Sequence, residues 1–228
     1  MKYEAVIFDL YGTLIDDLDF EEYHEVLRQM ADALSLPYEN FLAQWREISP
    51  SRALGTYKTV EECLVPICRA LEAEVDADQI KTATDIRMDY MRSIFVPRDD
   101  ALTTLSALTQ LGHKLGLISD CSSEIPLLWS QSPFAPLISH PVFSSRAGVK
   151  KPNPEIYRIA CDQLEVEPQD CLYIGDGNSR ELTGATQFGM TAVLIAVPDA
   201  PFYDHGGSEA RSWRGPKIAS LAKVLEFV

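Results

Sequence analysis

Acidic side chains directly follow several apolar runs of this sequence, at positions where a buried strand would end. Asp9 follows the run in "EAVIFDL", Asp120 follows "KLGLIS", and Asp176 follows "CLYIG". The carboxyl ends of parallel strands meet at one edge of a sheet, and ligands bind there. A carboxylate at such a place can act as a covalent nucleophile or hold a hard metal ion. The pattern therefore predicts a site in which acidic side chains carry the chemistry.

A hydroxyl, a lysine and a further acid complete this candidate site. Ser119 ends the second apolar run, Lys151 stands in "GVKKPNP" just before a predicted helix, and Glu181 comes five residues after Asp176. Two carboxylates about 4 Å apart repel each other by roughly 4 kcal/mol at an effective dielectric constant of 20. A magnesium ion, which prefers oxygen ligands, removes that cost, and Lys151 neutralises the nucleophile or a substrate anion. Capping of a turn or a helix is the alternative role for any single one of these side chains.

The elements that position these residues alternate between strand and helix. Buried strands are predicted for the apolar runs at 4–10, 114–119, 171–175 and 191–196. Helical patterns lie between most of them, at 99–112 and at 153–164. Strands that lack polar alternation and are interleaved with helices predict an α/β fold, in which helices cover both faces of a parallel sheet.

The stretch from 16 to 94 contains no convincing strand. Its amphipathic helical patterns include 20–34 and 59–75, the latter interrupted by Pro66. Because this stretch lies between the first strand and the second, we predict an inserted, all-helical cap over the carboxyl edge of the sheet. The predicted domains are a catalytic core of residues 1–15 and 95–228 and a cap of residues 16–94.

Two further segments have an expected place but no assigned chemistry. "PSRALGTYKT" at 50–59, which contains Arg52, is either a solvated loop between helices or a substrate-specificity loop that faces Asp9. The stretch 198–216, rich in Pro, Gly and Asp, is predicted to be a long ordered loop. "KIASLAKVLEFV", which follows it, is predicted to be a last helix that packs on the sheet.

The composition narrows the classes of partner. The 228 residues carry a net charge of -14, from 20 basic and 34 acidic residues, which argues against nucleic acid and anionic membranes as partners. Five cysteines without a C-x-x-C pair, and no signal peptide, are typical of a reduced cytoplasmic protein. No apolar run reaches the roughly 18 residues of a membrane span. We expect a cytoplasmic monomer or homodimer whose partner is a small anionic metabolite.

Four of the segments already quoted resemble, in order and spacing, the four motifs of the haloacid dehalogenase superfamily. They are "FDLYGTLID", "LGLISDCS", "KKPNPEIY" and "YIGDGNSREL". That superfamily includes phosphatases, dehalogenases and phosphonatases. The resemblance covers 3–14 and about 99–196, and it implies a Rossmann-like core, while 16–94 resembles a helical cap of the family.

The resemblance also implies roles for individual residues. Asp9 would be the nucleophile that forms an aspartyl ester, a known form of covalent catalysis by carboxylates. Ser119 would bind the substrate anion, and Lys151 would hold that anion and Asp9 together. The metal ligands would be Asp9, Asp176 and Glu181, with a place behind the ligands as the alternative for Glu181. The remaining residues assigned to substrate binding are Thr13, Asp120 and Asn178.

Tyr11 departs from the phosphatases of this superfamily, which usually have an aspartate two residues after the nucleophile. A tyrosine with a pKa near 10 donates a proton but is a poor base, and loss of a positioned acid–base group typically costs about 10²- to 10⁴-fold in rate. The form "DLYGT" instead resembles the L-2-haloacid dehalogenases, which need no magnesium. In "LAQWREI", Arg46 would correspond to the arginine that receives the halide in those enzymes.

The fourth motif resembles the magnesium-binding form. Asp176 stands where the metal-free dehalogenases have a serine, and an unneutralised Asp176 beside Asp9 would repel a haloacid carboxylate. We therefore predict a magnesium-dependent hydrolase, a phosphatase acting on a small phosphorylated metabolite, with Tyr11 counted among its catalytic residues. Two alternatives remain. One is a metal-free L-2-haloacid dehalogenase that uses Asp9 and Arg46, and the other is a ligand-binding protein with little turnover.

Overall fold

The computed structural model describes residues 2–198 and 208–228, and within them the strands form one parallel sheet. The order across this sheet is β3-β2-β1-β4-β5-β6. The strands are β1 (Ala5–Phe8), β2 (Lys114–Ser119), β3 (His140–Phe143), β4 (Cys171–Gly175), β5 (Thr191–Ile195) and β6 (Lys217–Ile218). All pairings are parallel, as predicted, and the fold is a Rossmann-like α/β fold.

The register of the central strands brings their carboxyl ends level. Phe8 of β1 pairs with Leu117 of β2 on one side and with Ile174 of β4 on the other. Successive strands proceed from β1 to β3 on one side and from β4 to β6 on the other, so the direction of winding reverses beside β1. Such a switch point leaves a crevice at the carboxyl edge. The residues that follow β1 and β4 therefore lie at the place where this fold binds ligands.

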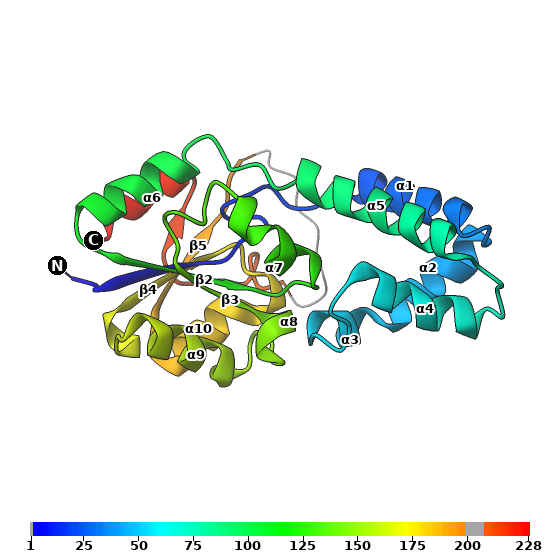
Figure 1. Ribbon diagram of the computed structural model, residues 1–228. Helices are drawn as coiled ribbons and strands as arrows, with labels where there is room; N and C mark the ends of the chain where they lie inside the picture. The colour runs from blue at the N-terminus through cyan, green and yellow to red at the C-terminus, as the bar shows by residue number, and fades with distance from the viewer. Residues whose placement is uncertain (1, 199–207) are drawn as a thin grey trace.

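Helices cover both faces of the sheet (Figure 1). On one face, α6 (Ala101–Gln110) and the 3₁₀ helix η4 (Leu221–Glu226) pack over β1, β2 and β4 in one apolar cluster. On the other face, α9 (Pro154–Leu164) and α10 (Glu181–Phe188) pack against the opposite side of the same strands in a second cluster. Because β1 is buried on both faces, its four residues are all apolar.

Short elements connect these layers. They are α7 (Glu124–Leu128), η1 (Trp129–Gln131), α8 (Ser144–Ala147), η2 (Pro168–Asp170) and η3 (Asn178–Arg180). In α9 the side chain of Asn153 caps the first turn by accepting a hydrogen bond from the amide of Glu155, and Pro154 occupies the first helical position. Lys151 is thereby held just ahead of a well-defined helix start.

An all-helical segment lies beyond the carboxyl edge of the sheet (Figure 1). We call Phe20–Ser93 the helical segment; it consists of α1 (Phe20–Ala33), α2 (Tyr38–Glu47), α3 (Ser49–Ala53), α4 (Val60–Ala70) and α5 (Ala77–Ser93). It has its own apolar cluster, which includes Phe41, Trp45 and Ile67. The side chain of Asp76 caps α5, and that of Asp19 caps α1. The division into a core of 1–15 and 95–228 and a cap of 16–94 stays a prediction.

Several sequence expectations differ from the structure. α4 continues through Pro66 and ends at Ala70, so the helical pattern 59–75 is shortened at both ends. The segment expected to be a last helix instead forms β6 and the six-residue η4. Neither β3 nor β6 was predicted, because β3 contains His140 and Pro141 and β6 is only two residues long. Of the predicted loop 198–216, residues 199–207 lie outside the described residues, and the rest contains neither a helix nor a strand.

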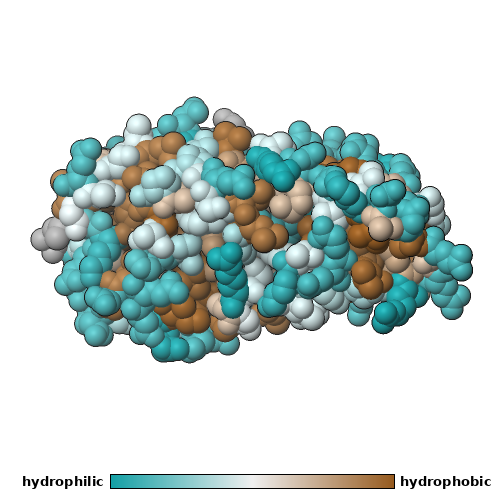
Figure 2. All heavy atoms as spheres, viewed as in Figure 1, coloured by the Kyte–Doolittle hydropathy of each residue, from teal (hydrophilic) through white to brown (hydrophobic). Residues whose placement is uncertain are grey.

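The surface in view in Figure 2 mixes hydrophilic and hydrophobic side chains over both halves of the molecule. None of the helices within residues 2–198 and 208–228 has the length and apolar character needed to cross a membrane.

Candidate active site

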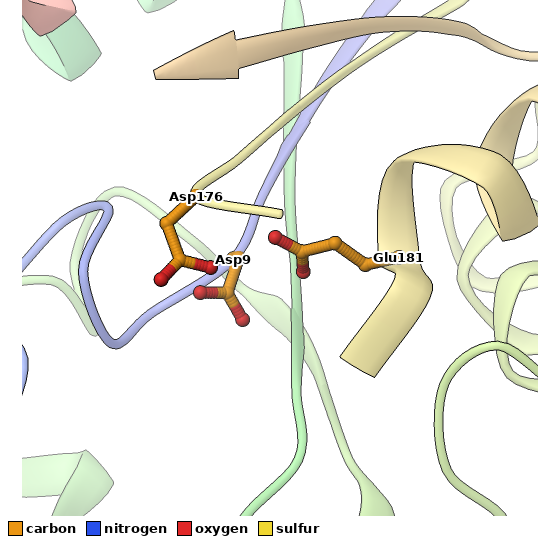
Figure 3. A group of neighbouring side chains, drawn as sticks. All are labelled: Asp9, Asp176 and Glu181. Atoms are coloured by element: carbon orange, nitrogen blue, oxygen red, sulfur yellow. The ribbon is translucent and has the colours of Figure 1, made fainter. Parts of the chain in front are cut away.

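Three carboxylates meet at the carboxyl edge of the sheet (Figure 3). Asp9 directly follows β1, Asp176 directly follows β4, and Glu181 is the first residue of α10. One carboxylate oxygen of each lies within 4.8 Å of the corresponding oxygens of the other two, and all three side chains are buried. The amide of Asp9 donates to the carbonyl of Ile174 at 2.9 Å, so the ladder between β1 and β4 itself fixes this arrangement.

Lys151 supplies the buried cation of this cluster. Its Nζ donates to Oδ1 of Asp9 at 2.5 Å and to Oε2 of Glu181 at 2.6 Å. The backbone amide of Lys151 donates to Oδ1 of Asp120 at 3.0 Å, which ties the lysine to the end of β2. Asp9 after β1 and Glu181 of α10 thus bind the ammonium group of Lys151, while Asp120 after β2 binds its backbone amide.

Glu181 is fully committed to partners within the protein. Besides Lys151, its Oε2 accepts from the hydroxyl of Tyr173 at 2.7 Å, and its Oε1 accepts from the amide of Gly177 at 2.9 Å. Gly175 makes this possible, because a Cβ at that position would lie 2.1 Å from Oε1 of Glu181. Glu181 therefore positions Lys151 and the loop that carries Asp176. This fits the alternative role given to Glu181 in the sequence analysis, in which it supports the metal ligands from behind and does not contact the ion.

The loop after β4 is held in an unusual backbone conformation. Gly177, Ser179 and Arg180 all have positive φ angles, of 89°, 56° and 54°. Such angles are costly for residues other than glycine and are often found at functional sites. Asn178 donates from its amide to Oδ1 of Asp176 at 2.9 Å and from Nδ2 to Oδ2 at 2.7 Å. The loop thus orients Asp176. Asn178 was predicted to bind the substrate, and in the structure it donates hydrogen bonds to the carboxylate of Asp176.

Crowding of the acids raises their pKa values. Burial, together with the neighbouring charge of Glu181, raises the pKa of Asp9 to about 7 in spite of Lys151. Burial and the charges of Glu181 and Asp9 raise the pKa of Asp176 to about 9. Burial alone would lower the pKa of Lys151, but Asp9 and Glu181 outweigh it and raise that pKa well above its usual value. The ammonium therefore stays charged while the acids compete for protons.

The charge and donor set of the cluster fit a divalent metal ion. When all three carboxylates are ionised, they and the ammonium group of Lys151 carry a net charge of −2. A divalent cation with oxygen ligands cancels this charge and relieves the repulsion that raises the pKa values of Asp9 and Asp176. Gly12, with φ of 71°, leaves the necessary space, because a Cβ there would lie 2.6 Å from Oδ2 of Asp176. Asp9 and Asp176 are the residues placed to contact such an ion.

A cavity of about 560 Å³ opens between this cluster and the helical segment. The sheet side of its wall includes Asp9, Asp120 and Lys151, and the opposite side includes Trp45 and Arg52. A volume of this size is within the range that encloses a small metabolite. The buried nucleophile candidate is therefore reached from a compartment shared by the sheet and the helical segment.

Four other residues predicted for the site lie either in the interior of the protein or on the wall of the cavity. Ser119 and Thr13 are fully buried, and neither hydroxyl has a hydrogen-bond partner among the described residues. Tyr11 lines the cavity, and burial raises its pKa well above 10, so that its phenol stays protonated at neutral pH. Arg46 also lines the cavity, but it is an exposed residue in the last turn of α2.

Some residues that shape the site were not found from the sequence. Tyr173 lies within an apolar strand and showed no sign of its bond to Glu181. Arg87 and Glu124 form a buried ion pair with 2.9 Å between Nε and Oε1. Arg87 stands in an amphipathic helix and Glu124 is the first residue of a short one, so only its spatial position distinguishes each from an exposed charge. Arg52 was named only within a possible loop, but it belongs to α3 and is buried.

The sequence matches a known family of hydrolases. A family model described as haloacid dehalogenase-like hydrolase matches residues 3–189. The chain belongs to this family. The resemblance seen in the four motifs is thereby confirmed, together with the hydrolase class.

Relatives within the family have two kinds of activity. Over 201 residues the chain is 27% identical to the glyceraldehyde 3-phosphate phosphatase of Methanopyrus kandleri, covering 84% of this chain and 83% of that protein. It is 26% identical over 201 residues to (S)-2-haloacid dehalogenase 4A of Burkholderia cepacia, covering 84% and 82%. The solved 2-haloacid dehalogenase of Pseudomonas syringae pv. Tomato DC3000 has the same fold, with a TM-score of 0.71, 20% identity and coverage of 98% and 97%.

Proposed function

We propose that this protein is a magnesium-dependent phosphatase that acts on a small phosphorylated metabolite through an aspartyl phosphate. The observation that supports this most is Asp176, whose carboxylate lies beside Asp9 and Glu181 with Lys151 as the one ammonium in contact with the cluster among the described residues. A dianionic phosphate would be repelled from this cluster unless a divalent cation offset its charge. When bound, magnesium supplies charge neutralisation for the acids and for the phosphoryl oxygens.

The residues of the chain divide the reaction between them. Lys151 holds Oδ1 of Asp9, and we assign the attack on phosphorus to the second oxygen of that carboxylate. A bond forms between this oxygen and phosphorus while the bond to the alkoxy or aryloxy group breaks. Water then attacks the phosphorus of the aspartyl phosphate, which releases phosphate and restores the Asp9 carboxylate. The helical segment acts as the cap that excludes other water from the cavity.

The leaving group needs a proton unless it is a weak base. Tyr11 lines the cavity two residues after Asp9 and stays protonated, so it is the group placed to donate. Its raised pKa makes it a weak acid, and because the phenol stays protonated it cannot accept a proton from the attacking water. The site therefore suits phosphates whose leaving groups require little protonation.

The second candidate function is hydrolysis of L-2-haloacids. Tyr11 and Arg46, the two residues that resemble the dehalogenase pattern, both line the cavity. In this reaction Asp9 would displace a halide, which needs no proton donor, and water would hydrolyse the ester. Asp176 counts against it, because its charge would repel the carboxylate of a haloacid unless a cation were bound or the carboxyl were protonated.

A substrate screen with and without magnesium separates the two functions. We expect release of phosphate from phosphomonoesters that stops on addition of a chelator, and no release of halide from 2-haloacids. Asp9→Asn, which keeps the size of the side chain but removes the nucleophile, should abolish turnover and leave the folded protein intact. Halide release that resists the chelator would establish the dehalogenase, and full activity in folded Asp9→Asn would exclude both.

A further inference from the structure

Two buried arginines face the cavity from the helical segment. Arg52 on α3 and Arg87 on α5 are 7% and 3% exposed, and both line the cavity that contains Asp9. Nε and Nη1 of Arg52 and Nη1 of Arg87 have no hydrogen-bond partner within the described part of the chain. A buried donor on a charged group that lacks an acceptor is costly, and a guanidinium cannot lose its charge to avoid this cost. These donors are thus available to an acceptor from outside the chain.

Glu124 is the buried acid that lies near the two guanidinium groups. Arg87 pairs with Glu124 at 2.9 Å, while Arg52 forms no salt bridge among the residues that the structure describes. Burial by itself would raise the pKa of Glu124. The positive charges of Arg87 and, to a smaller extent, Arg52 outweigh burial and lower this pKa to about 2, so the carboxylate is ionised. Two positive charges and one negative charge leave a net charge of +1 on these three buried side chains. The charge that would balance it is that of a monoanion.

Aromatic rings hold the guanidinium groups in place. Cζ of Arg52 lies 3.8 Å from the centre of the Trp45 ring, and Cζ of Arg87 lies 5.3 Å from that of the Tyr23 ring. Nε1 of Trp45 donates to the hydroxyl of Tyr23 at 2.9 Å, which fixes the two rings relative to each other. A planar guanidinium stacked on a ring keeps its edge for hydrogen bonding. The donors are therefore preorganised rather than mobile.

The position of α3 relative to the sheet is also fixed. Gly55, which follows α3 with φ of 75°, approaches α8 so closely that a Cβ there would lie 1.7 Å from the carbonyl oxygen of Ser145. Because α8 follows β3 directly, this contact links the end of α3 to the sheet. Arg52 thus lies at a defined place in the same cavity as Asp9 and Lys151, at the wall opposite them.

We propose that Arg52 and Arg87 bind a carboxylate of the substrate, at the end of the molecule away from the scissile bond, so that the substrate class is a phosphorylated carboxylic acid. A carboxylate carries the single negative charge that this wall lacks, and its two oxygens match the planar fork of a guanidinium. A second phosphate, with a charge near −2, would overcompensate the net charge of one. The phosphate half of this inference rests on the proposed function, whereas the carboxylate half rests on the arginines alone.

The kinetic test uses two phosphomonoesters that differ only in this group, 3-phosphoglycerate with its carboxylate and glycerol 3-phosphate with a hydroxymethyl group. We expect wild-type kcat/KM to favour 3-phosphoglycerate by roughly 10- to 100-fold, the range of a hydrogen bond to a charged group. Arg52→Gln should remove most of this preference and change kcat/KM for glycerol 3-phosphate by less than about 3-fold, since one charge-assisted bond accounts for the preference. Arg52→Lys, which keeps the charge without the fork, should retain part of it.

Matched variants separate this effect from a general loss of charge. Arg69→Gln removes an exposed arginine from α4 and should leave the preference as in the wild type. Circular dichroism and a thermal melt check that Arg52→Gln is folded. Should it fail to fold, the wild-type preference decides, because equal kcat/KM for the two esters contradicts the inference without any variant.

A binding experiment tests the carboxylate site without turnover. Calorimetry compares 3-sulfopropanoate with propane-1-sulfonate, neither of which can be hydrolysed by transfer of phosphate. Tighter binding of 3-sulfopropanoate, lost in Arg52→Gln, supports the inference even if no phosphomonoester is a substrate and the proposed function fails. Equal binding of the two sulfonates by the wild type overturns the inference, whatever the enzyme hydrolyses.

Discussion

Protons and a metal ion compete for the same carboxylates at the centre of the site. The pKa values of Asp9 and Asp176 are raised to about 7 and about 9. A magnesium ion binds the ionised forms, so its binding must displace protons below these values. The affinity for magnesium should therefore rise with pH from about 6 and level off only above the pKa of Asp176, about 9.

Calorimetry in two buffers of different ionisation enthalpy checks this prediction. Proton release on binding should be large at pH 6.5 and should decrease as the pH rises through about 9.

The metal-free protein should also lose stability as the pH rises. Between pH 3.8, the usual pKa of an aspartate, and the raised pKa values of Asp9 and Asp176, the folded state holds more protons than the unfolded chain. An affinity that is the same at pH 6.5 and pH 9 would contradict the raised pKa values.

Tyr11 determines the second prediction at this scale. Because its phenol is a weak acid, departure of a basic alkoxide should be slow, and aryl and acyl phosphates should be better substrates than sugar phosphates. Tyr11→Asp introduces a group with a better matched pKa and should raise the rate on alkyl phosphates by up to about 10²-fold. The measurement is the ratio of alkyl to aryl phosphate turnover in both proteins. Tyr11→Phe serves as the control, and a ratio that is unchanged by Tyr11→Asp means that proton transfer at this position does not limit the rate.

At the scale of elements, a buried ion pair joins two helices. Arg87 of α5 and Glu124 of α7 are both almost fully buried, so the pair connects the helical segment to the segment after β2. Replacement of Glu124 by Gln leaves the charges of Arg87 and Arg52 uncompensated and should destabilise the fold by roughly 3–5 kcal/mol. Denaturant titration at pH 7 measures this, and Glu155→Gln, in an exposed pair with Arg158, is the control in which no comparable loss is expected.

The same pair implies a pH dependence with a defined sign. The pKa of Glu124 is lowered from 4.5 to about 2, so its contribution to stability is complete above about 4.5 and is lost as the pH falls toward 2. Glu124→Gln should therefore be as stable as the wild type near pH 2 but not at pH 7. A constant difference between the two proteins over this range would show that the ion pair is not the cause.

The turn from β4 into α10 gives a further prediction. A Cβ at Gly175 would lie 2.1 Å from Oε1 of Glu181, so Gly175→Ala must displace the carboxylate that holds Lys151. A displacement near 1 Å in a catalytic group can reduce the rate by about 10²-fold, and we expect a loss in kcat of this order. Gly148→Ala is the control, because its Cβ would meet nothing within 4 Å and only its φ of 71° is strained. Its effect should appear in thermal stability and not in kcat.

At the scale of the whole molecule, magnesium should stabilise the folded protein. Asp9 and Asp176 belong to segments 167 positions apart that meet only in the folded sheet, so the unfolded chain offers no such site. A ligand that binds only the folded state adds about 2.7 kcal/mol at a concentration 100 times its Kd. The melting temperature should therefore rise with added magnesium in the wild type. Asp176→Ala should lack this rise, and an equal rise in both proteins would place the ion elsewhere.

Local sequence patterns determined the sheet and most of the cluster at its edge. Continuous apolar runs indicate strands buried on both faces, and the acids that end β1 and β4 must then share one edge, as Asp9 and Asp176 do. β3 and β6 were not predicted. β3 has four residues, which include His140 and Pro141, and β6 has two, so neither strand shows a detectable hydrophobic pattern. The prediction of a last helix was wrong, because Ile218 pairs with Ile195 of β5 in the sheet in spite of the helical pattern of the segment.

Only the tertiary structure decided how the charges of the site are divided. The sequence assigned Glu181 to the site but not its partners, and contacts with Lys151, Tyr173 and Gly177 depend on how α10 packs against β4. Arg52 and Arg87 look like surface arginines in sequence. They are buried because α3 packs against α8 and α5 packs against α7, near the carboxyl edge of the sheet. Whether a charged side chain finds a partner depends on such contacts between segments that are far apart in the sequence. Spacing along the chain therefore specified the nucleophile end of the cavity, and packing alone specified the opposite wall.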